Sequence, residues 1–424
     1  ALRVDGNRFV DAAGQPVQLR GASIRVLESW LVQGHDPTTP WGGQPNGNTT
    51  EPPDFRAMTT QWFMNVVRLP LNEASWLGLT CVDLGGAYGR TPGSLVRADP
   101  LGNYKSTVQL AVAAAHAAGL YVILDLHWAA PGNVCPVGPN AFANADHSLD
   151  FWTSVANTFK ANPAVLFEVF HAPLPVGLAS SADDWALWSG VFSPAGSFDH
   201  LYVYGPEPKA PTSYHWNATS MQALVHAIRG TGASNVILIA GENAAGNLSG
   251  WLTGGTASVF DMLSPPQLAA VWHAYPGSNN YSAAEYLTPL NQTNLSITGP
   301  SPALAQRLGT VAGPVFSQLR DILDAGYPVI ITEYGDQNAT AAQPGQALSS
   351  AAPFAAEILQ FADYPGAANQ ARISYVAWSF NTNTNLSNTL LQPPPNTTAT
   401  ASPGFGEYVQ SHYQCRAAGE LDCE

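Results

Sequence analysis

Short apolar runs alternate along the chain with polar loops and with segments whose apolar residues recur at helical spacing. Runs of this length are typical of buried strands, and the intervening spacing is typical of helices with one apolar face. Clear helical segments lie at residues 103–119 and 148–161. The pattern predicts eight strands, at residues 18–23, 65–71, 121–128, 164–170, 235–241, 268–275, 328–335 and 373–380.

Strands that are apolar along their whole length are buried on both faces, as in parallel sheets covered by helices. Eight strand–helix units favour a closed barrel over an open doubly wound sheet. The first strand is not followed by a glycine-rich phosphate-binding loop, which further disfavours an open sheet. We therefore predict the α/β class and a (β/α)8 TIM barrel, preceded by a β-hairpin at residues 3–17.

Two regions fall outside this repeat. Residues 174–219, rich in Trp, Tyr, Pro and Ser, form a long insertion after strand four, which we predict to be a loop. Loops of that length within a compact domain are usually functional. We predict one barrel domain over residues 1–391, with residues 392–424 as a tail packed on the barrel.

Composition narrows the class of partner. The chain carries a net charge of −14, and its three lysines are Lys105, Lys160 and Lys209. This balance argues against nucleic acid and anionic membranes as partners. No stretch approaches the ~20 apolar residues of a membrane-spanning helix. We expect a monomer.

Four cysteines predict two disulfides, Cys81 with Cys135 and Cys415 with Cys423, although four buried thiols would also fit the count. Disulfides indicate an oxidising compartment. The chain opens on Ala1, which we interpret as a mature terminus, and we expect a secreted protein, extracellular or periplasmic. The first pair follows strands two and three, so a bridge there would brace the loops at their carboxyl ends.

Polar and aromatic side chains gather at the predicted carboxyl ends of strands two to eight. In a barrel enzyme the working residues lie at this edge and in the loops that follow it. Any one of them alone could be structural, but seven consecutive strands that carry such groups favour an active site. The residues are Arg68, Asn72, Glu73, Asp125, His127, Trp128, His171, Glu242, Asn243, His273, Tyr275, Glu333, Tyr334, Trp378 and Asn381.

The segments that hold these residues together resemble glycoside hydrolase family 5, a family of retaining (β/α)8 glycosidases. They read NVVRLPLNEASWLG, YVILDLHW, LFEVFHAP, VWHAYP, VIITEYG and VAWSFN, and they span nearly the whole chain. The resemblance implies that Glu333 is the catalytic nucleophile and that Trp378 is the aromatic floor under the reacting sugar. It also implies that the sugar is bound by Arg68, His127, Trp128, His273 and Tyr275.

The chain departs from the family at strand four. The family pattern there ends in Asn-Glu-Pro, whose Glu is the general acid/base, whereas this chain reads His171-Ala172-Pro173. Glu168 does not replace the missing acid, because it lies four residues earlier and inside the strand. Loss of the acid removes a contribution of about 10²–10⁴-fold to the rate.

Three explanations are open. Ala172 could be an artificial Glu→Ala substitution of the kind that traps a bound substrate. The loss could instead be natural, with Glu242 or His171 as acid/base, or with a substrate whose leaving group needs no protonation. Third, the chain could be a carbohydrate-binding pseudoenzyme. Glu242 and His171 also have structural interpretations. Glu242 could form a salt bridge or a hydrogen bond at the rim, and His171 could donate a hydrogen bond in place of the amide of the family's Asn.

We expect no metal and no cofactor. Asp146 and His147 are metal-ligand types, but no third ligand is spaced nearby and Asp146 suits the start of a helix. The function that we expect is a secreted retaining β-glycosidase acting on a β-linked oligo- or polysaccharide or glycoside. An aldolase or dehydrogenase barrel is disfavoured, because no lysine ends a strand. The insertion at 174–219 would wall off the cleft and favour short or decorated substrates.

Overall fold

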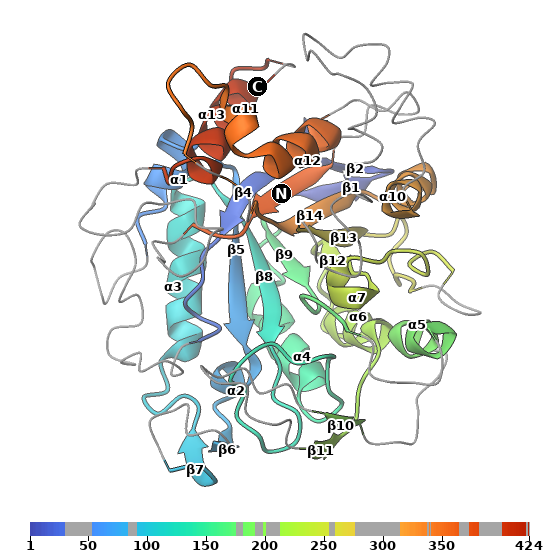
Figure 1. Cartoon of the computed structure of the whole chain (residues 1–424). Helices are drawn as coiled ribbons and strands as arrows, with labels where there is room; N and C mark the ends of the chain where they lie inside the picture. The colour runs from blue at the N-terminus through green and yellow to red at the C-terminus, as the bar shows by residue number, and fades with distance from the viewer. Residues whose placement is uncertain are drawn as a thin grey trace.

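A closed barrel of eight parallel strands forms the centre of the computed structural model (Figure 1). The structure describes residues 1–29, 53–83, 91–174, 181–190, 198–200, 213–253, 259–275, 314–336, 339, 341–363, 373–380, 401–420 and 423. Strands that follow one another in the chain are neighbours in the barrel, and the last pairs with the first. They are β4 (Arg20–Ser23), β5 (Val66–Asn72), β8 (Tyr121–Trp128), β9 (Val165–Glu168), β12 (Ile237–Ala240), β13 (Leu268–Ala274), β14 (Val329–Tyr334) and β15 (Ser374–Ala377).

Each predicted run overlaps one of these strands, and β5 extends one residue past its run, so the α/β class and the (β/α)8 barrel are confirmed. The reason is the alternation of side chains along a strand. On β5, Val66 packs with Ile123 and Val271 inside the barrel. The next residue, Val67, packs instead in the shell between strands and helices. Both faces are apolar, which produces the continuous hydrophobic runs seen in the sequence.

The amino end of the barrel is closed by a small antiparallel sheet. It consists of β1 (Arg3–Asp5), β2 (Arg8–Val10) and β3 (Pro16–Val17), so the predicted hairpin has a third strand. Leu2, Val4 and Phe9 pack with the apolar residues of the barrel interior. A site open to solvent is therefore expected at the other end of the barrel, where the carboxyl ends of the strands lie.

Helices cover the outside of the barrel. The two predicted helical segments contain α3 (Tyr104–Ala117) and α4 (Ser148–Phe159), which bury their apolar faces against the strands. The other described helices outside the insertion and the tail are α1 (Arg56–Thr60), α2 (Glu73–Leu77), α6 (Met221–Gly230), α7 (Glu242–Ala245), α10 (Pro314–Asp324), α11 (Leu348–Ala351) and α12 (Pro353–Asp363).

The prediction of a loop over residues 174–219 is wrong for the parts of it that the structure describes. They include helix α5 (Ser181–Ser189) and an antiparallel ribbon of β10 (Phe198–His200) with β11 (Ser213–Trp216). Helix α5 is held against the carboxyl end of β12, because Trp188 Nε1 donates a hydrogen bond of 2.8 Å to the carbonyl of Ala240. Its buried Trp residues, which composition alone assigned to a loop, pack this helix onto the barrel.

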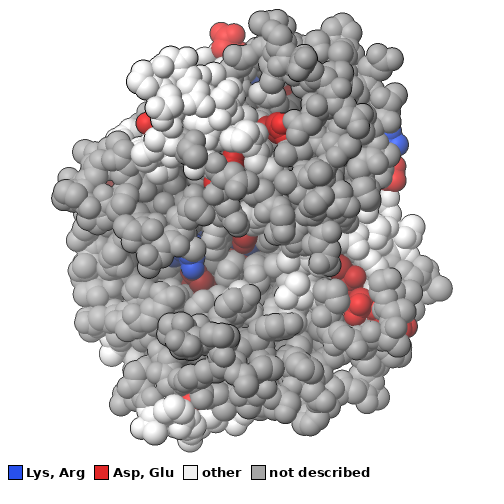
Figure 2. Space-filling view, in the orientation of Figure 1, with Lys and Arg blue, Asp and Glu red and all other residues white. Residues whose placement is uncertain are grey.

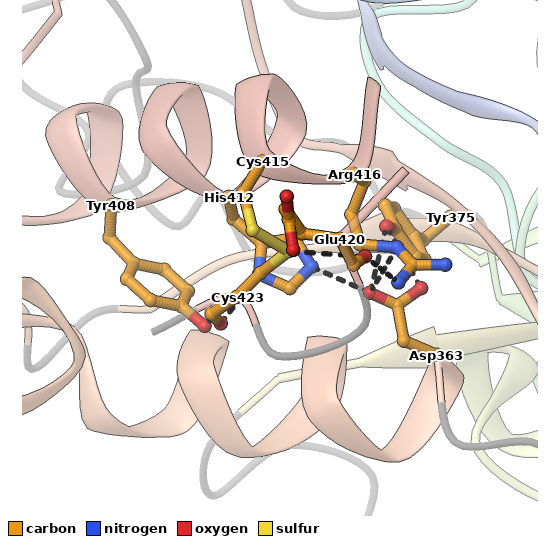
Figure 3. The surroundings of a disulfide bond; sticks show 8 residues. All are labelled: Asp363, Tyr375, Tyr408, His412, Cys415, Arg416, Glu420 and Cys423. Carbon is orange, nitrogen blue, oxygen red and sulfur yellow. Dashed lines mark hydrogen bonds and ion pairs between the residues drawn. A yellow bond between two sulfur atoms is a disulfide. The ribbon is translucent and has the colours of Figure 1, made fainter. Parts of the chain in front are cut away.

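The predicted tail supplies the helix of the eighth strand–helix unit. Helix α13 (Phe405–Ala417) lies beside α12 in Figure 1 and hydrogen-bonds the barrel through Tyr413, whose hydroxyl donates to Gly21 O at 2.9 Å. The boundary that we predicted at residue 392 lies outside the described residues. As Figure 3 shows, Asp363 at the end of α12 faces His412 Nε2 at 2.9 Å and Arg416 Nε at 3.2 Å.

Both predicted cysteine pairs are disulfides in the structure. Cys81 of β6 (Thr80–Asp83) is bonded to Cys135, and Cys415 of α13 is bonded to Cys423. Strand β6 forms a ribbon with β7 (Ser94–Arg97) beyond the carboxyl end of β5. Among the described helices, none is long and apolar enough to cross a membrane.

Candidate active site

Arg68 is the centre of a buried charged cluster inside the barrel. Its side chain is fully buried, and its nitrogens contact three carboxyl groups. Nε and Nη2 donate to Glu168 at 2.7 and 3.1 Å, and Nη1 donates to Glu333 at 2.7 Å. Nη2 also lies 2.8 Å from Oδ2 of Asp125. Three neighbouring strands and the opposite wall of the barrel therefore converge on one guanidinium.

One positive charge cannot balance three carboxylates in a buried place. Burial raises the pKa of Asp125 and of Glu168 to about 8, although Arg68 acts to lower both. Burial opposes the charge of Arg68 as well, but the three carboxyl groups outweigh it and raise its pKa. Near neutral pH the cluster therefore holds Arg68 ionised and protons on Asp125 and Glu168.

Glu333 is the carboxyl group of this cluster that stays ionised. Its Oε2 accepts a hydrogen bond of 3.1 Å from Tyr275 and lies 3.7 Å from Nδ1 of His273. Burial alone would raise the pKa of Glu333, but His273 and Arg68 together hold it well below its usual value. Because burial lowers the pKa of His273 to about 4, Arg68 is the group that remains charged at neutral pH. Glu333 is thus an oriented carboxylate.

An aromatic wall stands beside this carboxylate. The ring of His127 stacks on Trp378, with 5.3 Å between centroids and 10° between planes. Its Nδ1 lies 2.7 Å from Asp125, which fixes the imidazole. Trp378 is half-buried, and the guanidinium of Arg25 lies 5.1 Å from its ring centroid. A flat ring next to a carboxylate is the surface on which the apolar face of a pyranose can stack.

His171 joins the same wall from the segment after β9. Its ring centroid lies 4.0 Å from that of His127 and 6.4 Å from that of His273. Within the described residues, its buried Nδ1 has no hydrogen-bond partner. Burial lowers the pKa of His171 well below its usual value, so the ring is neutral at ordinary pH. A neutral imidazole can donate one hydrogen bond but is a weak source of protons.

Most of the residues predicted at the strand ends meet in this cluster. They come from β5, β8, β13, β14 and β15 and from the segment that follows β9. The residues brought together are Arg68, Asp125, His127, His171, His273, Tyr275, Glu333 and Trp378.

Asn72, Glu73 and Tyr334 are instead structural. Asn72 caps α2 by accepting from Ser75 N, and Glu73 is buried, with Ser148 Oγ donating to it at 2.6 Å. Tyr334 points to the outer face of β14, where its hydroxyl lies 2.8 Å from that of Tyr413. The sequence placed these residues at strand ends correctly, but their side chains contact residues of α2, α4 and α13 outside the barrel.

The remaining expected residues are not joined to this cluster by any described contact. Trp128 is buried, and no described contact joins it to the cluster; Asn381 lies outside the described residues. Asp146 accepts from Gly132 N at 2.7 Å, and His147 Nε2 lies 2.6 Å from Gly132 O. The pair therefore braces a loop, and the expectation that Asp146 starts a helix is wrong, since α4 has no side-chain cap. The described residues contain no group of metal-ligating side chains.

Sequence reasoning did not find the roles of Glu168 and Thr332. Thr332 Oγ1 donates to Glu168 at 2.8 Å and lies 3.0 Å from Nε2 of His273. Glu168 links this hydroxyl to Arg68 and is fully buried. A charged residue within an apolar strand was the available signal, because such a group is kept only when it is paired.

The residue that follows His171 is Ala172, whose side chain has no carboxyl group. Ala172 is 9% exposed at the carboxyl end of β9. Glu242 follows β12, the barrel strand next to β9. Its side chain is 4% exposed, and it forms none of the ion pairs found among the described residues. The charge that acts on Glu242 is that of Asp184 on α5. The expectation of a rim salt bridge at Glu242 is therefore not supported by the described contacts.

The family model for cellulase (glycosyl hydrolase family 5) matches residues 10–384. The chain belongs to glycosyl hydrolase family 5. A curated relative, endoglucanase MaCel5A of Microbulbifer sp. (strain ALW1), is 27% identical over 172 residues, which are 41% of this chain and 26% of that protein. The match thus covers about a quarter of the relative's length.

Solved structures of family 5 share the fold. The β-glucanase SdGluc5_26A of Saccharophagus degradans, in complex with cellotetraose, has a TM-score of 0.55 and 18% identity, over 98% of this chain and 93% of that one. The catalytic domain of Thermobifida fusca endoglucanase Cel5A, as a Glu→Gln variant in complex with cellotetraose, has a TM-score of 0.52 and 15% identity, over 97% of both chains. At these low sequence identities, the similarity is evidence of a shared fold alone.

Few of the described residues on the face seen in Figure 2 are charged. In Figure 2, the described surface on this face is mostly free of Lys, Arg, Asp and Glu, and acidic and basic atoms adjoin near its middle.

Proposed function

We propose that this protein is a retaining β-glycosidase in which Glu333 is the nucleophile. The observation that carries the proposal is the environment of Glu333. Its oxygens are oriented by Arg68 and Tyr275, its pKa is held low, and the stacked rings of His127 and Trp378 lie in the same cluster. An ionised and oriented carboxylate beside an aromatic platform is what attack on an anomeric carbon requires.

In the first step Glu333 forms a bond to the anomeric carbon while the bond to the leaving oxygen breaks. Arg68 keeps one carboxylate oxygen in place at 2.7 Å, so that the other is free to attack. Tyr275 shares its proton with that second oxygen at 3.1 Å and can pass the hydrogen bond to the ring oxygen as charge leaves the carboxylate. Water then releases the sugar with retained configuration.

The proposed substrate is a β-glucan or a related β-linked glycoside. Relatives in family 5 include an endoglucanase and a β-glucanase, and two of the similar structures hold cellotetraose. The aromatic floor at Trp378 suits the flat equatorial faces of a β-linked glucose chain. The disulfides support secretion into an oxidising compartment.

A fluorinated aryl β-glucoside with a good leaving group tests the nucleophile. Such a substrate departs without protonation and leaves a long-lived glycosyl-enzyme, so the mass of the protein should rise by one fluoroglucosyl group. Peptide mapping should place that group on Glu333. Glu333→Gln should give no adduct, whereas Glu73→Gln, at a buried carboxyl of α2, should give the same adduct as the unchanged chain.

Binding of cello-oligosaccharides without any adduct would instead support the carbohydrate-binding pseudoenzyme. Adduct formation on a residue other than Glu333 would overturn the assignment of the nucleophile while keeping the glycosidase.

A further inference from the structure

The loop after β12 lies beside the segment that lacks the acid. Strands β9 and β12 pair with a constant register, Phe167 opposite Ile237 and Glu168 opposite Leu238. Beyond the strand ends, Ala172 lies in the segment after β9, and Glu242 is the first residue of α7, which follows β12. The two segments still run together there, because the amide of Ala244 donates a hydrogen bond of 2.8 Å to Pro173 O.

The nucleophile lies on the second strand from β12. Strand β13 pairs Val271 with Ala240, the last residue of β12, and pairs His273 with Glu333 on β14, with a register shift between Trp272 and His273. Glu242 is two strands away from Glu333, whereas Ala172 is three strands away. Each step between neighbouring strands is about 4.8 Å. A carboxyl group on β12 is therefore no farther around the ring from Glu333 than one at position 172.

Glu242 is a buried acid at the start of α7. Its carboxyl group is 4% exposed, and Oε1 has no hydrogen-bond partner among the described residues. The charge that acts on this carboxyl group is that of Asp184 on the insertion helix α5, which is held at the carboxyl end of β12. Ionisation of both of these buried carboxyl groups would be unfavourable, so one of them retains a proton.

We propose that Glu242 is the general acid/base of this protein, transferred by one strand from the family position, and that Asp184 is the positioning residue that keeps it protonated. This proposal rests on the glycosidase function proposed above. It assigns a catalytic purpose to the insertion, since α5 supplies Asp184.

The step balances with one proton. Glu242 gives its proton to the leaving oxygen while Glu333 bonds to the anomeric carbon, and the alcohol departs neutral. The Glu242 carboxylate then takes a proton from water as that water attacks the same carbon and frees Glu333. Burial first, and then the charge of Asp184, raise the pKa of Glu242 to about 8, so the acid form is present at neutral pH.

His171 is the weaker candidate for this role. Its pKa lies well below the ordinary value, because burial disfavours the charged ring and the neighbouring His127 adds to the effect. The ring is therefore neutral where the enzyme would work and has no proton to give beyond a hydrogen bond. His171 suits contact with a sugar hydroxyl better than protonation of a leaving group.

Two aryl β-glucosides with different leaving groups test the proposal. Dinitrophenolate departs unaided, whereas phenolate needs an acid. Glu242→Gln should leave the rate of glycosyl-enzyme formation from the dinitrophenyl substrate within about 3-fold and lower that from the phenyl substrate by about 10²–10⁴-fold. Asp183→Asn is the matched control, because it removes a neighbouring charge from α5, and it should change neither rate.

A second arm separates acid catalysis from folding. The double variant Glu242→Gln with Ala172→Glu returns an acid to the family position and should recover the phenyl glucoside rate. Asp184→Asn should move the alkaline limb of the pH profile to lower pH, since the charge that raises the pKa of Glu242 is gone. The other titratable side chains on the described flanking segments are His171 and His273, which stay neutral over this range, and Glu168 of β9. Burial raises the pKa of Glu168 to about 8, so Glu168 titrates in the unchanged chain and in Asp184→Asn alike.

An equal effect of Glu242→Gln on both substrates, or no effect on either, would overturn the proposal. If the protein is not a glycosidase, the unchanged chain would cleave neither glucoside. That result is distinguishable from failure of the Glu242 assignment.

Discussion

Asp125 shows how one residue serves two partners at once. Its Oδ2 lies 2.7 Å from His127 Nδ1 and 2.8 Å from Arg68 Nη2, while Oδ1 is buried without a hydrogen-bond partner among the described residues. With its pKa raised to about 8 by burial, the carboxyl holds a proton at neutral pH and resembles an amide in charge. The site therefore needs only one oxygen of Asp125, as the hydrogen-bond acceptor for His127 and Arg68.

Two substitutions of Asp125 should therefore differ sharply. Asp125→Asn keeps an oxygen for Arg68 and His127 and should cost about 1 kcal/mol in the free energy of unfolding at pH 7. Asp125→Ala removes the acceptor and leaves a buried charge without one of its partners, at a cost of about 3–5 kcal/mol. Denaturant unfolding of both variants measures the difference, and equal losses would contradict it.

Trp378 should act on substrate affinity more than on folding. In Trp378→Ala the platform is lost, and kcat/KM on cello-oligosaccharides should fall about 10-fold, the equivalent of about 1.4 kcal/mol of lost stacking. Trp378→Phe keeps an aromatic face and should lose less. Steady-state kinetics on both variants provide the test, and unchanged kcat/KM in the Ala variant would remove Trp378 from the sugar site.

At the scale of elements, the two disulfides tie down different kinds of segment. Cys81–Cys135 closes a loop of 54 residues and joins β6 to the segment after β8, next to the carboxyl ends of β5 and β8. Cys415–Cys423 closes a loop of 8 residues at the end of α13. Figure 3 shows this second bridge above the contacts of Asp363 with His412 and Arg416.

Loss of the longer loop should cost more. The entropy lost by the unfolded chain predicts about 4 kcal/mol for the Cys81→Ser/Cys135→Ser pair and about 2.5 kcal/mol for the Cys415→Ser/Cys423→Ser pair. Thermal unfolding of the two double variants, each compared with the unchanged chain, measures the order. A larger loss at the C-terminal pair would show that native contacts of α13, rather than loop entropy, dominate.

At the scale of the whole molecule, several buried acids tie stability to pH. The pKa values of Asp125, Glu168 and Glu242 are all raised to about 8 by burial. A carboxyl whose pKa is higher in the folded chain stabilises it fully below the unfolded pKa, and that stability is lost as pH rises to about 8. Glu333 has the opposite sign, so its contribution is present at neutral pH and is lost only under acid.

The free energy of unfolding should therefore fall between pH 5 and pH 9. Glu242→Gln does not titrate and should reduce that fall by up to about 4 kcal/mol, at about 1.4 kcal/mol for each pKa unit. Glu420→Gln, at an exposed carboxyl of the C-terminal segment, is the control and should leave the slope as it is. A flat profile for the unchanged chain would mean that these acids are not held protonated.

The sequence alone determined the eight strands, because each is an apolar run buried on two faces, and it located Glu333, Arg68 and Trp378 at the ends of those runs. It could not determine which strand-end side chains point inward, since Tyr334 and Glu73 look the same in sequence as residues of the cluster. It assigned α13 to a tail and α5 to a loop, because both segments lie outside the predicted repeat of strands and helices. Only the closed barrel brings the segment of Glu242 beside that of Ala172, where Ala244 N donates to Pro173 O, and joins Glu168 to Arg68. Such contacts depend on the arrangement of the strands and not on distance along the chain.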